Sequence, residues 1–525
     1  MQDHDLCQTV RRQAGTRPDA IAYHTPSRTW TFAQMHEESS RVAQGLLKTG
    51  IKPGDRIAVL TKHTADCLAL LLGACKIGAV CMPVNWRLAA PEIEFILENG
   101  EAKMLLTDDA FLAVARSTEY ANKIPILSTD GSAGVQRFDD WRAQFAATDP
   151  GYQPQPSQTA VQLYSSGTTG LPKGVELTHA NLIICFSTLA DEMQFGPSSI
   201  MLNTLPTFHI SGVGPGLMTF YHGALMVFHP DFDPPKILRA IAEHTITHVF
   251  FVPAMILALL NTDGVDRTDY SSLKIISYGA SPITDKVLID ALHTFKCGFL
   301  QVYGLTETTG AITYLPPQDH DPEGPKKALL RAAGRAGAGV DLRIVDAETG
   351  NTCADGDVGE VWIRTAQNML GYWRNSPATT QAFPQGRERN NDQGGWFRSG
   401  DAGYLRDGYL FIHDRIKDMI ISGGENIYPA EVENMLVQHP AIADCAVIGV
   451  PDQRWGEAVK ACVVLRANRQ ANEHEVIAFS RERIAHYKCP KSVDFVAALP
   501  RNPSGKILKY QLRAPYWKGH TRLVN

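Results

Sequence analysis

A segment rich in glycine and hydroxyl side chains, Tyr164–Val175, carries the clearest chemical pattern in the sequence. Its residues 165–174 read SSGTTGLPKG, which is four hydroxyls, three glycines and one lysine in ten positions. Such a loop can direct several N–H and O–H donors at a polyphosphate. It is not a Walker A loop, because Lys173 is followed by Gly174 and not by Ser or Thr. A flexible surface loop is the alternative, but the ordered Pro-Lys-Gly ending favours phosphate binding.

Three further segments carry unusual polar residues directly after predicted strands. They read PTFHISG at Pro206–Gly212, YGASP at Tyr278–Pro282 and YGLTET at Tyr303–Thr308. In an open parallel sheet, ligands bind at the carboxyl ends of the strands. We therefore expect the three segments to converge on one cleft.

The elements that must position these segments alternate between strand and helix. The first run has strands Arg56–Leu60, Val80–Val84 and Lys103–Thr107 with helices at Ala65–Ile77 and from Pro91. Upstream, Thr31 and Gln34 form a capping-box pattern for a helix. A second run has strands Met201–Leu205, Ala224–Phe228, His248–Val252, Lys274–Ser277 and Gly298–Val302, separated by helices such as Pro234–His244 and Ile283–Phe295. A β-α-β pattern of this kind predicts parallel sheets covered on both faces.

The pattern changes after Ala338. Short strands split by Gly and Asp turns predict a small antiparallel unit: Asp341–Val345, Gly359–Arg364 and Tyr409–His413. Beyond a boundary near Asp414–Lys417 we expect a compact α+β set, with helices from Pro429 and Glu473 and strands Ala443–Val450, Ala458–Leu465 and Val493–Val496. The predicted fold is α/β: a large N-terminal domain (1–416) with doubly wound sheets and a small antiparallel barrel-like unit, and a small mobile α+β C-terminal domain (417–525).

Composition excludes several classes of protein. The 525 residues are 44% hydrophobic and 20% charged, with a net charge of −5, which argues against nucleic-acid binding through a basic surface. No apolar run reaches the roughly 20 residues of a membrane span, and the N-terminus has no secretory pattern. The ten cysteines form no C-x-x-C pair, so we expect reduced thiols in a cytoplasmic protein.

Five motifs in a fixed order resemble the adenylate-forming superfamily of acyl- and aryl-CoA synthetases. They are Ser165–Gly174, Tyr303–Thr308, Ser399–Asp401 (SGD), Asp414–Glu431 (DRIKDMIISGGENIYPAE) and Pro500–Ile507 (PRNPSGKI). The resemblance covers essentially the whole chain. It implies a reaction in two steps, in which a carboxylate attacks the α-phosphate of ATP to give acyl-AMP and pyrophosphate, and a thiol, usually coenzyme A (CoA), then displaces AMP.

The same resemblance implies a nucleotide site. The β- and γ-phosphates would be held by Ser165, Ser166, Gly167, Thr168, Thr169, Gly170 and Lys173. Glu307 would ligate Mg²⁺ and Thr306 would touch the α-phosphate. Asp401, assisted by Arg415, would accept hydrogen bonds from both ribose hydroxyls. The adenine would lie near Gly279, Ala280, Ser281, Tyr303 and Gly304.

Simpler roles remain open for three of these residues. Glu307 could cap a helix, Asp401 could be an ordinary turn residue, and Tyr303 could pack in the core.

The resemblance also assigns the moving parts. Lys506 would be the catalytic lysine, a mobile positive charge for the α-phosphate and the substrate carboxylate. Lys417 falls at the hinge position, where many members carry Asp, and Gly423 and Gly424 would line the pantetheine tunnel. His209 would lie between the acyl pocket and the thiol tunnel, with a buried, hydrogen-bonded structural histidine as the alternative.

The presumed pocket segments favour a monocarboxylic fatty or aryl acid. They are small and largely apolar, with no cation to pair a second carboxylate, and Gly310 and Ala311 leave room for a chain. His209 stands where amino-acid-activating relatives usually carry Asp. The alternatives are adenylation with a non-CoA acceptor (an acyl-AMP ligase or luciferase-like enzyme), a kinase or ATPase, and a non-catalytic nucleotide-binding module. A homodimer is compatible with the sequence.

Overall fold

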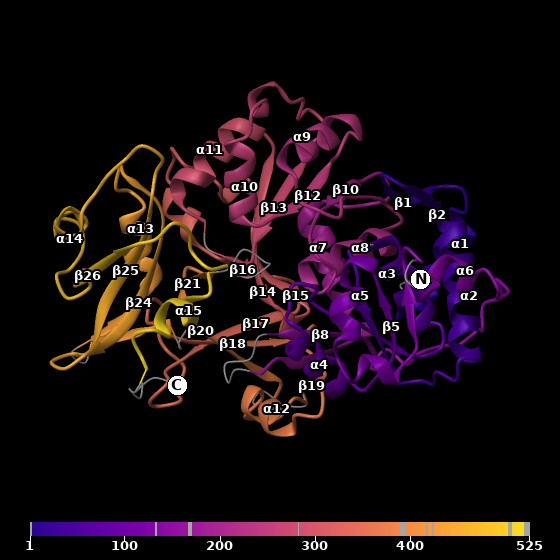
Figure 1. Cartoon of the computed structure of the whole chain (residues 1–525). Helices are drawn as coiled ribbons and strands as arrows, with labels where there is room; N and C mark the ends of the chain where they lie inside the picture. Colours follow the sequence, from indigo (N-terminus) through magenta and orange to yellow (C-terminus); the bar gives the residue numbers. More distant parts are fainter. Residues whose placement is uncertain are drawn as a thin grey trace.

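The protein folds around three β-sheets (Figure 1). The computed structural model describes residues 3–62, 64–131, 134–165, 171–281, 283–388, 394–415, 418–422, 425–501 and 507–518. The sheets have eight, thirteen and five strands. The first two lie in the part of the chain that precedes residue 416, and the third lies in the part that follows residue 417.

The eight-stranded sheet has a parallel centre and an antiparallel edge. Its order is β19-β9-β8-β4-β3-β5-β6-β7. The parallel strands are β3 (Arg56–Leu60), β4 (Val80–Pro83), β5 (Ala102–Thr107), β6 (Ile126–Ser128) and β7 (Gln136–Arg137). The edge is formed by β8 (Thr159–Ser165), β9 (Lys173–Thr178) and β19 (Gly371–Tyr372). Every residue of β3 is buried, as expected for a strand covered on both faces.

The thirteen-stranded sheet continues from a parallel half into an antiparallel half without a break. Its parallel strands are β1 (Ile21–Thr25), β10 (Ile200–Asn203), β11 (Leu225–Phe228), β12 (His248–Phe251), β13 (Ile275–Gly279) and β14 (Gly298–Leu305). The antiparallel strands are β2 (Arg28–Thr31) at one edge and, beyond β14, β15 (Gly310–Leu315), β16 (Gly334–Ala336), β21 (Tyr409–Arg415), β20 (Trp396–Arg406), β18 (Gly359–Thr365) and β17 (Val340–Val345). The antiparallel strands expected after Ala338 therefore extend the same sheet that carries β14.

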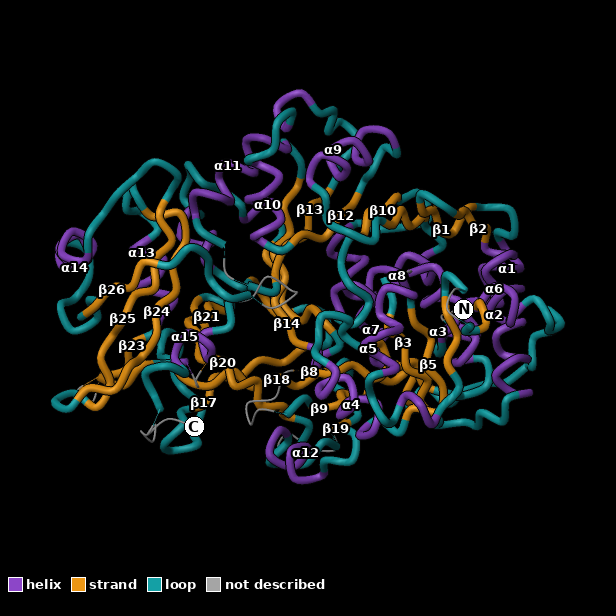
Figure 2. The backbone as a smooth tube through the Cα atoms, viewed as in Figure 1, coloured by secondary structure: helices purple, strands orange, loops and turns teal. Residues whose placement is uncertain are grey.

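Helices fill the space between the two large sheets and cover their outer faces (Figures 1 and 2). The shared core includes buried residues of α2 (Phe32–Lys48), α3 (Thr64–Cys75), α7 (His179–Met193) and α8 (Ile210–His222). A second core joins β12 and β13 to α9 (Pro234–Glu243), α10 (Pro253–Leu260) and α11 (Asp285–Phe295). The predicted capping box is confirmed, because the Thr31 and Gln34 side chains each bond the backbone N–H of the other.

The remaining helices lie at the periphery of the large sheets. They are α1 (Leu6–Thr16), α4 (Ala90–Asn99), α5 (Asp109–Arg116), α6 (Phe138–Arg142) and α12 (Ser376–Ala382). Eight of the ten cysteines are buried and none is paired in a disulfide. Among the described residues, no helix has both the length and the apolar character needed to cross a bilayer.

The five-stranded sheet lies at the end of the molecule opposite the N-terminal helices (Figure 1). It contains β22 (Ile420–Ser422), β23 (Glu425–Ile427), β24 (Ile442–Asp452), β25 (Gly456–Leu465) and β26 (Ser492–Phe495), with α13 (Pro429–Leu436), α14 (Glu473–Arg481) and α15 (Lys509–Arg513). The rings of His413 on β21 and Tyr428 stack 4.6 Å apart, so this unit contacts the large one. The predicted domain boundary at 416/417 lies outside the described residues.

Candidate functional site

Three of the four segments that the sequence singles out meet at one edge of the thirteen-stranded sheet. Strands β10, β12, β13 and β14 are parallel neighbours, and β13 and β14 pair up to Gly279 and Val302. The His209 segment follows β10, Ala280 follows β13 and Thr306 follows β14. Tyr278, Gly279 and Tyr303–Leu305 belong to the strands themselves, so the expected loops begin two or three residues later than the sequence pattern predicts.

Glu307 connects this edge to the hydroxyl-rich segment. Its Oε1 accepts a hydrogen bond from Ser165 Oγ at 2.9 Å and a second from the Tyr372 hydroxyl at 3.0 Å. Glu307 follows β14, whereas Ser165 ends β8 and Tyr372 lies on β19 of the eight-stranded sheet. The carboxylate therefore spans the gap between the two large sheets, and it does not serve only as a helix cap.

The strands that flank the hydroxyl-rich segment, β8 and β9, pair in an antiparallel manner. Ser165 at the end of β8 pairs with Lys173 at the start of β9, so both ends of the segment lie side by side. Lys173 Nζ stands 5.0 Å from the centre of the Tyr372 ring, a cation–π contact. Ser165, Lys173, Glu307 and Tyr372 thus form one cluster. Tyr372 had no motif to mark it in the sequence. Ser166, Gly167, Thr168, Thr169 and Gly170 lie outside the described residues.

Tyr303 and Asp401 form a second pair. The Tyr303 hydroxyl donates a 2.6 Å hydrogen bond to Asp401 Oδ2. Asp401 lies on β20 and is only 4% exposed, while Tyr303 lies on β14 and is half-buried. Tyr303 therefore has a polar contact in addition to its packing, and the simple core alternative does not describe it fully.

The Ser399-Gly400-Asp401 segment of β20 is held by three hydrogen bonds. Ser399 Oγ donates to the Val361 carbonyl at 2.6 Å and accepts from the Asp401 N–H at 3.0 Å. The Gly400 N–H donates to Glu360 Oε1 at 3.2 Å. Asp401 is the ladder partner of Arg415, as the predicted ribose pair requires, although the Arg415 side chain lies outside the described part of the chain. These bonds fix the backbone that carries Asp401, and the Tyr303 hydroxyl holds its carboxylate. Asp401 is therefore a strand residue and not an ordinary turn residue.

The two glycines of the predicted adenine site are required by strand packing. A Cβ at Gly279 would lie 2.2 Å from the Val302 carbonyl oxygen, and one at Gly304 would lie 1.8 Å from that of Gly310. The neighbouring strands alone thus explain why these residues are small. Ala280 has a φ of 67°, unusual for a residue with a Cβ, and it is exposed at the carboxyl end of β13 with Ser281 beside it. Strained backbone of this kind clusters at ligand sites.

His209 is the residue before α8, and one nitrogen of its ring lacks a hydrogen-bond partner among the described residues. This nitrogen, Nε2, is buried. Burial and, to a smaller extent, the Arg87 cation lower the pKa of His209 to about 4, so the ring is neutral at pH 7. A structural histidine with all its hydrogen bonds made, which was the alternative, does not fit this environment.

Arg87 and Trp86 stand beside His209 and were missed by the sequence analysis. The Arg87 guanidinium carbon lies 3.9 Å from the centre of the Trp86 ring, and Trp86 packs edge-on against Phe208 at 6.0 Å. Lys62 Nζ lies 4.7 Å from the same Trp86 ring and pairs with Asp231 at 2.7 Å. The pocket segments predicted from sequence contain no cation, but the fold brings Arg87 to them from a distant segment.

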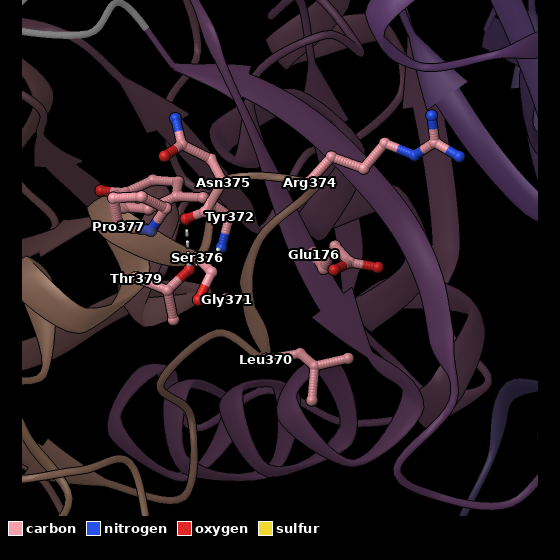
Figure 3. Close-up of a pocket in the computed structure, with 9 residues that line it drawn as sticks. All are labelled: Glu176, Leu370, Gly371, Tyr372, Arg374, Asn375, Ser376, Pro377 and Thr379. Carbon is pink, nitrogen blue, oxygen red and sulfur yellow. Dashed lines mark hydrogen bonds between the residues drawn. The ribbon is translucent and has the colours of Figure 1, made fainter.

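A pocket of about 550 Å³ lies behind Tyr372 (Figure 3). It is lined by Glu176, Leu370, Gly371, Tyr372, Arg374, Asn375, Ser376, Pro377 and Thr379. Its two charged side chains already have partners: Glu176 pairs with Arg56 at 2.9 Å and Arg374 with Glu101 at 2.6 Å. The charges that line this pocket are therefore neutralised within the protein.

Several predicted residues lie outside the described residues: Lys417, Gly423, Gly424 and Lys506. Arg501 and Ile507 form an antiparallel bridge, and the Leu508 N–H donates to the Pro500 carbonyl at 2.8 Å. Arg501 also pairs with Asp444 of β24 at 2.6 Å.

The donor set fits a nucleotide with a hard cation. Within the described residues there is no group of three or more His, Cys, Asp or Glu side chains that could hold a metal alone. Mg²⁺ does not need such a group, because it usually binds through one or two carboxylates and substrate phosphates. Glu307, fixed by two hydroxyls beside Lys173, is suited to that task, and Asp401 is suited to accept hydroxyl donors.

Comparison with known proteins agrees with this arrangement. Residues 10–373 match the family model of AMP-binding enzymes and residues 431–506 match that of the AMP-binding enzyme C-terminal domain. The fatty acid–[acyl-carrier-protein] ligase ScoC of Streptomyces coeruleorubidus is 38% identical over 99% of this chain and 98% of its own. The long-chain-fatty-acid–CoA ligase FadD13 of Mycobacterium tuberculosis is 35% identical over 97% of each chain.

Solved structures give the same result. The ATP-bound MatB of Rhodopseudomonas palustris superposes with a TM-score of 0.88 at 29% identity, covering 98% of this chain and 100% of that one. A Mycobacterium tuberculosis fatty acyl CoA synthetase superposes with a TM-score of 0.77 at 32% identity, covering 99% of each. The chain therefore belongs to the AMP-binding enzymes, the adenylate-forming superfamily of acid ligases that includes the acyl- and aryl-CoA synthetases.

Proposed function

We propose that this protein is an ATP-dependent acid–CoA ligase that activates a fatty or aryl monocarboxylate. A carboxylate oxygen attacks the α-phosphorus of ATP, the bond to the β-phosphate bridging oxygen breaks, and pyrophosphate leaves. The CoA thiol then attacks the acyl carbon of acyl-AMP and AMP leaves. The observation that carries the proposal is the Glu307 carboxylate, held by Ser165 and Tyr372 between the hydroxyl-rich segment and the nucleotide edge.

The first step is a problem of charge. An anionic carboxylate must approach an anionic phosphate, so catalysis depends on preorganised positive charge and donors. Lys173 and the segment Ser165–Gly170 would bind the β- and γ-phosphates, Thr306 would contact the α-phosphate, and Glu307 would hold the Mg²⁺ that neutralises these oxygens. Asp401, oriented by Tyr303, would fix the ribose. Lys506 would supply the last positive charge from the C-terminal unit.

The second step needs a thiol carried on a long phosphate-bearing arm. Lys417 would be the hinge about which the five-stranded unit rotates, and Gly423 and Gly424 would line the channel for the arm. Arg87 supports this acceptor, since its guanidinium stacks on Trp86 beside His209 and makes no ion pair within the described part of the chain. An unpaired arginine suits a phosphate.

A carrier protein is the alternative acceptor. It is favoured by the similarity to ScoC, whose name gives an acyl-carrier protein as its acceptor. Both acceptors present the same pantetheine thiol, so the described residues fit either.

The first test is exchange of labelled pyrophosphate into ATP in the presence of Mg²⁺ and single carboxylic acids. Exchange that depends on the acid supports adenylation, and no exchange with any acid rejects it. The second test compares AMP release with CoA and with a phosphopantetheinylated carrier protein. Faster release with CoA supports the CoA ligase, and release only with the carrier protein replaces it by the alternative. ADP in place of AMP and pyrophosphate would indicate a kinase or ATPase.

A further inference from the structure

Strand β20 is irregular at the residue that carries the proposed ribose contact. Its segment Ser399–Asp401 lies opposite a single residue of β18, Val361. The pairs that flank this irregularity are Glu360 with Ala402 and Trp362 with Arg398. Extra residues of this kind form a β-bulge, which bends the strand, interrupts the regular pairing and turns a side chain in a new direction. The direction of the Asp401 side chain therefore depends on the contacts that hold the bulge.

Two side chains bond backbone groups of the bulge. Ser399 Oγ donates to the Val361 carbonyl at 2.6 Å and accepts from the Asp401 N–H at 3.0 Å. The Gly400 N–H donates to Glu360 Oε1 at 3.2 Å. Gly400 has a φ of 70°, in the left-handed region that glycine adopts without strain. Because buried backbone groups without a partner cost free energy, Ser399 and Glu360 keep the bulge in this shape.

Glu360 is built into the sheet at this point and does not lie on its surface. The residue is only 4% exposed. Its Oε2 accepts from Trp362 Nε1 at 3.0 Å and from Arg398 Nε at 2.8 Å, while its Oε1 accepts from Gly400. Both oxygens therefore face donors, and the Arg398 charge balances that of the carboxylate. An ionised carboxylate can accept on both sides, whereas an amide has only one acceptor oxygen.

The Asp401 carboxylate is held from a second direction. The Tyr303 hydroxyl of β14 donates to its Oδ2, and the Asp401 backbone pairs with Arg415 of β21. The two sets of contacts have different tasks. The contacts from β18 set the position of the Asp401 backbone, and the Tyr303 hydroxyl sets the orientation of the carboxylate.

We propose that Glu360 and Ser399 are positioning residues for nucleotide recognition, which act through the β20 bulge to aim the Asp401 carboxylate at the ribose hydroxyls. This inference rests on the proposed function, in which Asp401 accepts from both hydroxyls, and it adds the residues that make this contact possible. Loss of either side chain lets the bulge relax, so the carboxylate no longer lies at a fixed distance from the ribose. The defect is therefore specific to the ribose hydroxyls and largely spares the chemistry at the α-phosphate.

The test compares the equilibrium affinities for ATP, 2′-deoxy-ATP and 3′-deoxy-ATP by calorimetry in the presence of Mg²⁺. The wild-type protein is expected to bind ATP more tightly than either deoxynucleotide by about tenfold or more, since a site that bonds a hydroxyl rejects the analogue without it. Asp401→Ala is the reference and should lose this preference. Glu360→Ala and Ser399→Ala are each expected to reduce the preference by about fivefold or more. In acid-dependent pyrophosphate exchange, both should raise the KM for ATP more than they lower kcat.

Matched variants separate positioning from a general loss of structure. Trp362→Phe removes a donor from the Oε2 side of Glu360 and leaves the Gly400 bond in place, so it should keep the wild-type preference. Ser399→Thr keeps the hydroxyl and should retain the preference that Ser399→Ala loses. If Glu360→Ala does not fold, Glu360→Gln replaces it. The single acceptor oxygen of the amide cannot serve both sides, so this variant should also reduce the preference.

Two results would overturn the inference and leave the proposed function intact. One is a wild-type preference for ATP in the Glu360 and Ser399→Ala variants when Asp401→Ala has lost it. The other is an equal loss in Trp362→Phe, which would assign the effect to the sheet as a whole.

The proposed function fails in a different way. If no acid supports exchange, the protein is not an acid ligase, and the binding measurements still decide the role of Glu360. If Asp401→Ala binds the three nucleotides with the wild-type ratios of affinity, the ribose assignment is wrong and the inference falls with it.

Discussion

The hydroxyl of Tyr303 donates a 2.6 Å hydrogen bond to Asp401 Oδ2, across a sequence separation of 98 residues. The bond joins the last parallel strand, β14, to an antiparallel strand of the same sheet, β20. It fixes the orientation of the Asp401 carboxylate at the carboxyl end of β14. The pair links the proposed adenine and ribose contacts into one rigid unit.

Tyr303→Phe is expected to raise the KM for ATP by roughly tenfold or more, because a hydrogen bond to a charged group is worth about 1.5–3 kcal/mol. The measurement is pyrophosphate exchange as a function of ATP concentration. Tyr278→Phe is the matched control. Tyr278 on β13 bonds Gln301 and His320, so its loss is expected to lower stability and leave the KM for ATP near the wild-type value. If the two variants have equal KM values for ATP, the Tyr303 hydroxyl has no role in ATP binding and Tyr303 only packs in the core.

Glu307→Gln is expected to reduce adenylation by roughly 10²–10³-fold at fixed Mg²⁺, since it removes one preorganised charge while keeping an oxygen for Ser165 and Tyr372. Higher Mg²⁺ should recover part of the rate. Tyr372→Phe keeps the charge and loses one hydrogen bond, so its effect should be much smaller. A Glu307→Gln variant with the wild-type dependence on Mg²⁺ would refute the metal role.

Lys506→Ala is expected to lose adenylation by roughly 10²–10³-fold and to keep thioester formation from supplied acyl-AMP. The reason is that the positive charge is needed where charge develops on the α-phosphate, and that bond is already made in acyl-AMP. Both half-reactions are measured separately, with Lys518→Ala, an exposed lysine in the same C-terminal part of the chain, as the control. Equal loss of the two half-reactions would contradict the assignment.

The ring of His209 is expected to add no limb to the pH–rate profile between pH 6 and 8. Burial lowers its pKa to about 4, so the ring is neutral throughout that range. Thioester formation in His209→Gln should therefore change in rate but not in the shape of its profile. Because this folded-state pKa lies below the ordinary value of 6.5, the histidine costs stability only in acid. The cost begins as pH falls below 6.5 and is complete below about 4. A limb near pH 6–7 that disappears in the variant would show that the ring titrates during catalysis.

Lys76 gives a prediction about stability. The side chain is fully buried, and its Nζ bonds the His36 carbonyl at 2.9 Å and Ser40 Oγ at 2.7 Å. Burial lowers its pKa from 10.5 to about 8, although Asp149 at 3.7 Å opposes this. The unfolded chain thus binds the proton more tightly, and stability should rise as pH increases from 8 to 10.5.

Lys76→Met is expected to remove this rise and to stabilise the protein at pH 7 by up to about 3 kcal/mol, if the methionine packs in the same space. Chemical unfolding at pH 7, 8, 9 and 10 measures both effects. Lys48→Met, at the exposed end of α2, is the control and should leave the pH dependence as it is. A steeper rise in the Lys76 variant would contradict the prediction.

The strands were the most predictable part of this fold. Arg56–Leu60 is a strand at the predicted residues because an uninterrupted apolar run is typical of a strand covered on both faces. The parallel pairing of β10, β12, β13 and β14 follows from their alternation with helices. The meeting of three segments at the carboxyl ends of these strands follows from the same pattern. Strand order was not predictable beyond β14, because nothing local to Ser399–Asp401 specifies that β20 joins the same sheet.

The misses share one physical cause. Tyr372 and Arg87 lie in segments with no motif, and only tertiary packing brings them to Glu307 and His209. Gly279 and Gly304, which the resemblance places near the adenine, also have neighbouring strands that leave no space for a Cβ. The sequence gives the type of each residue. The reason why that type is needed depends on the residues that pack against it in the fold.

The two large sheets meet where Glu307 of one accepts hydroxyls of the other. A nucleotide that contacts Asp401 on the first and Lys173 on the second would act as a non-covalent cross-link between them. By thermodynamic linkage, a substitution that loosens the packing of α3, α7 or α8 between the sheets should weaken ATP affinity even though the substituted residue does not contact ATP. Saturating ATP should in turn restore part of the stability that the substitution removes.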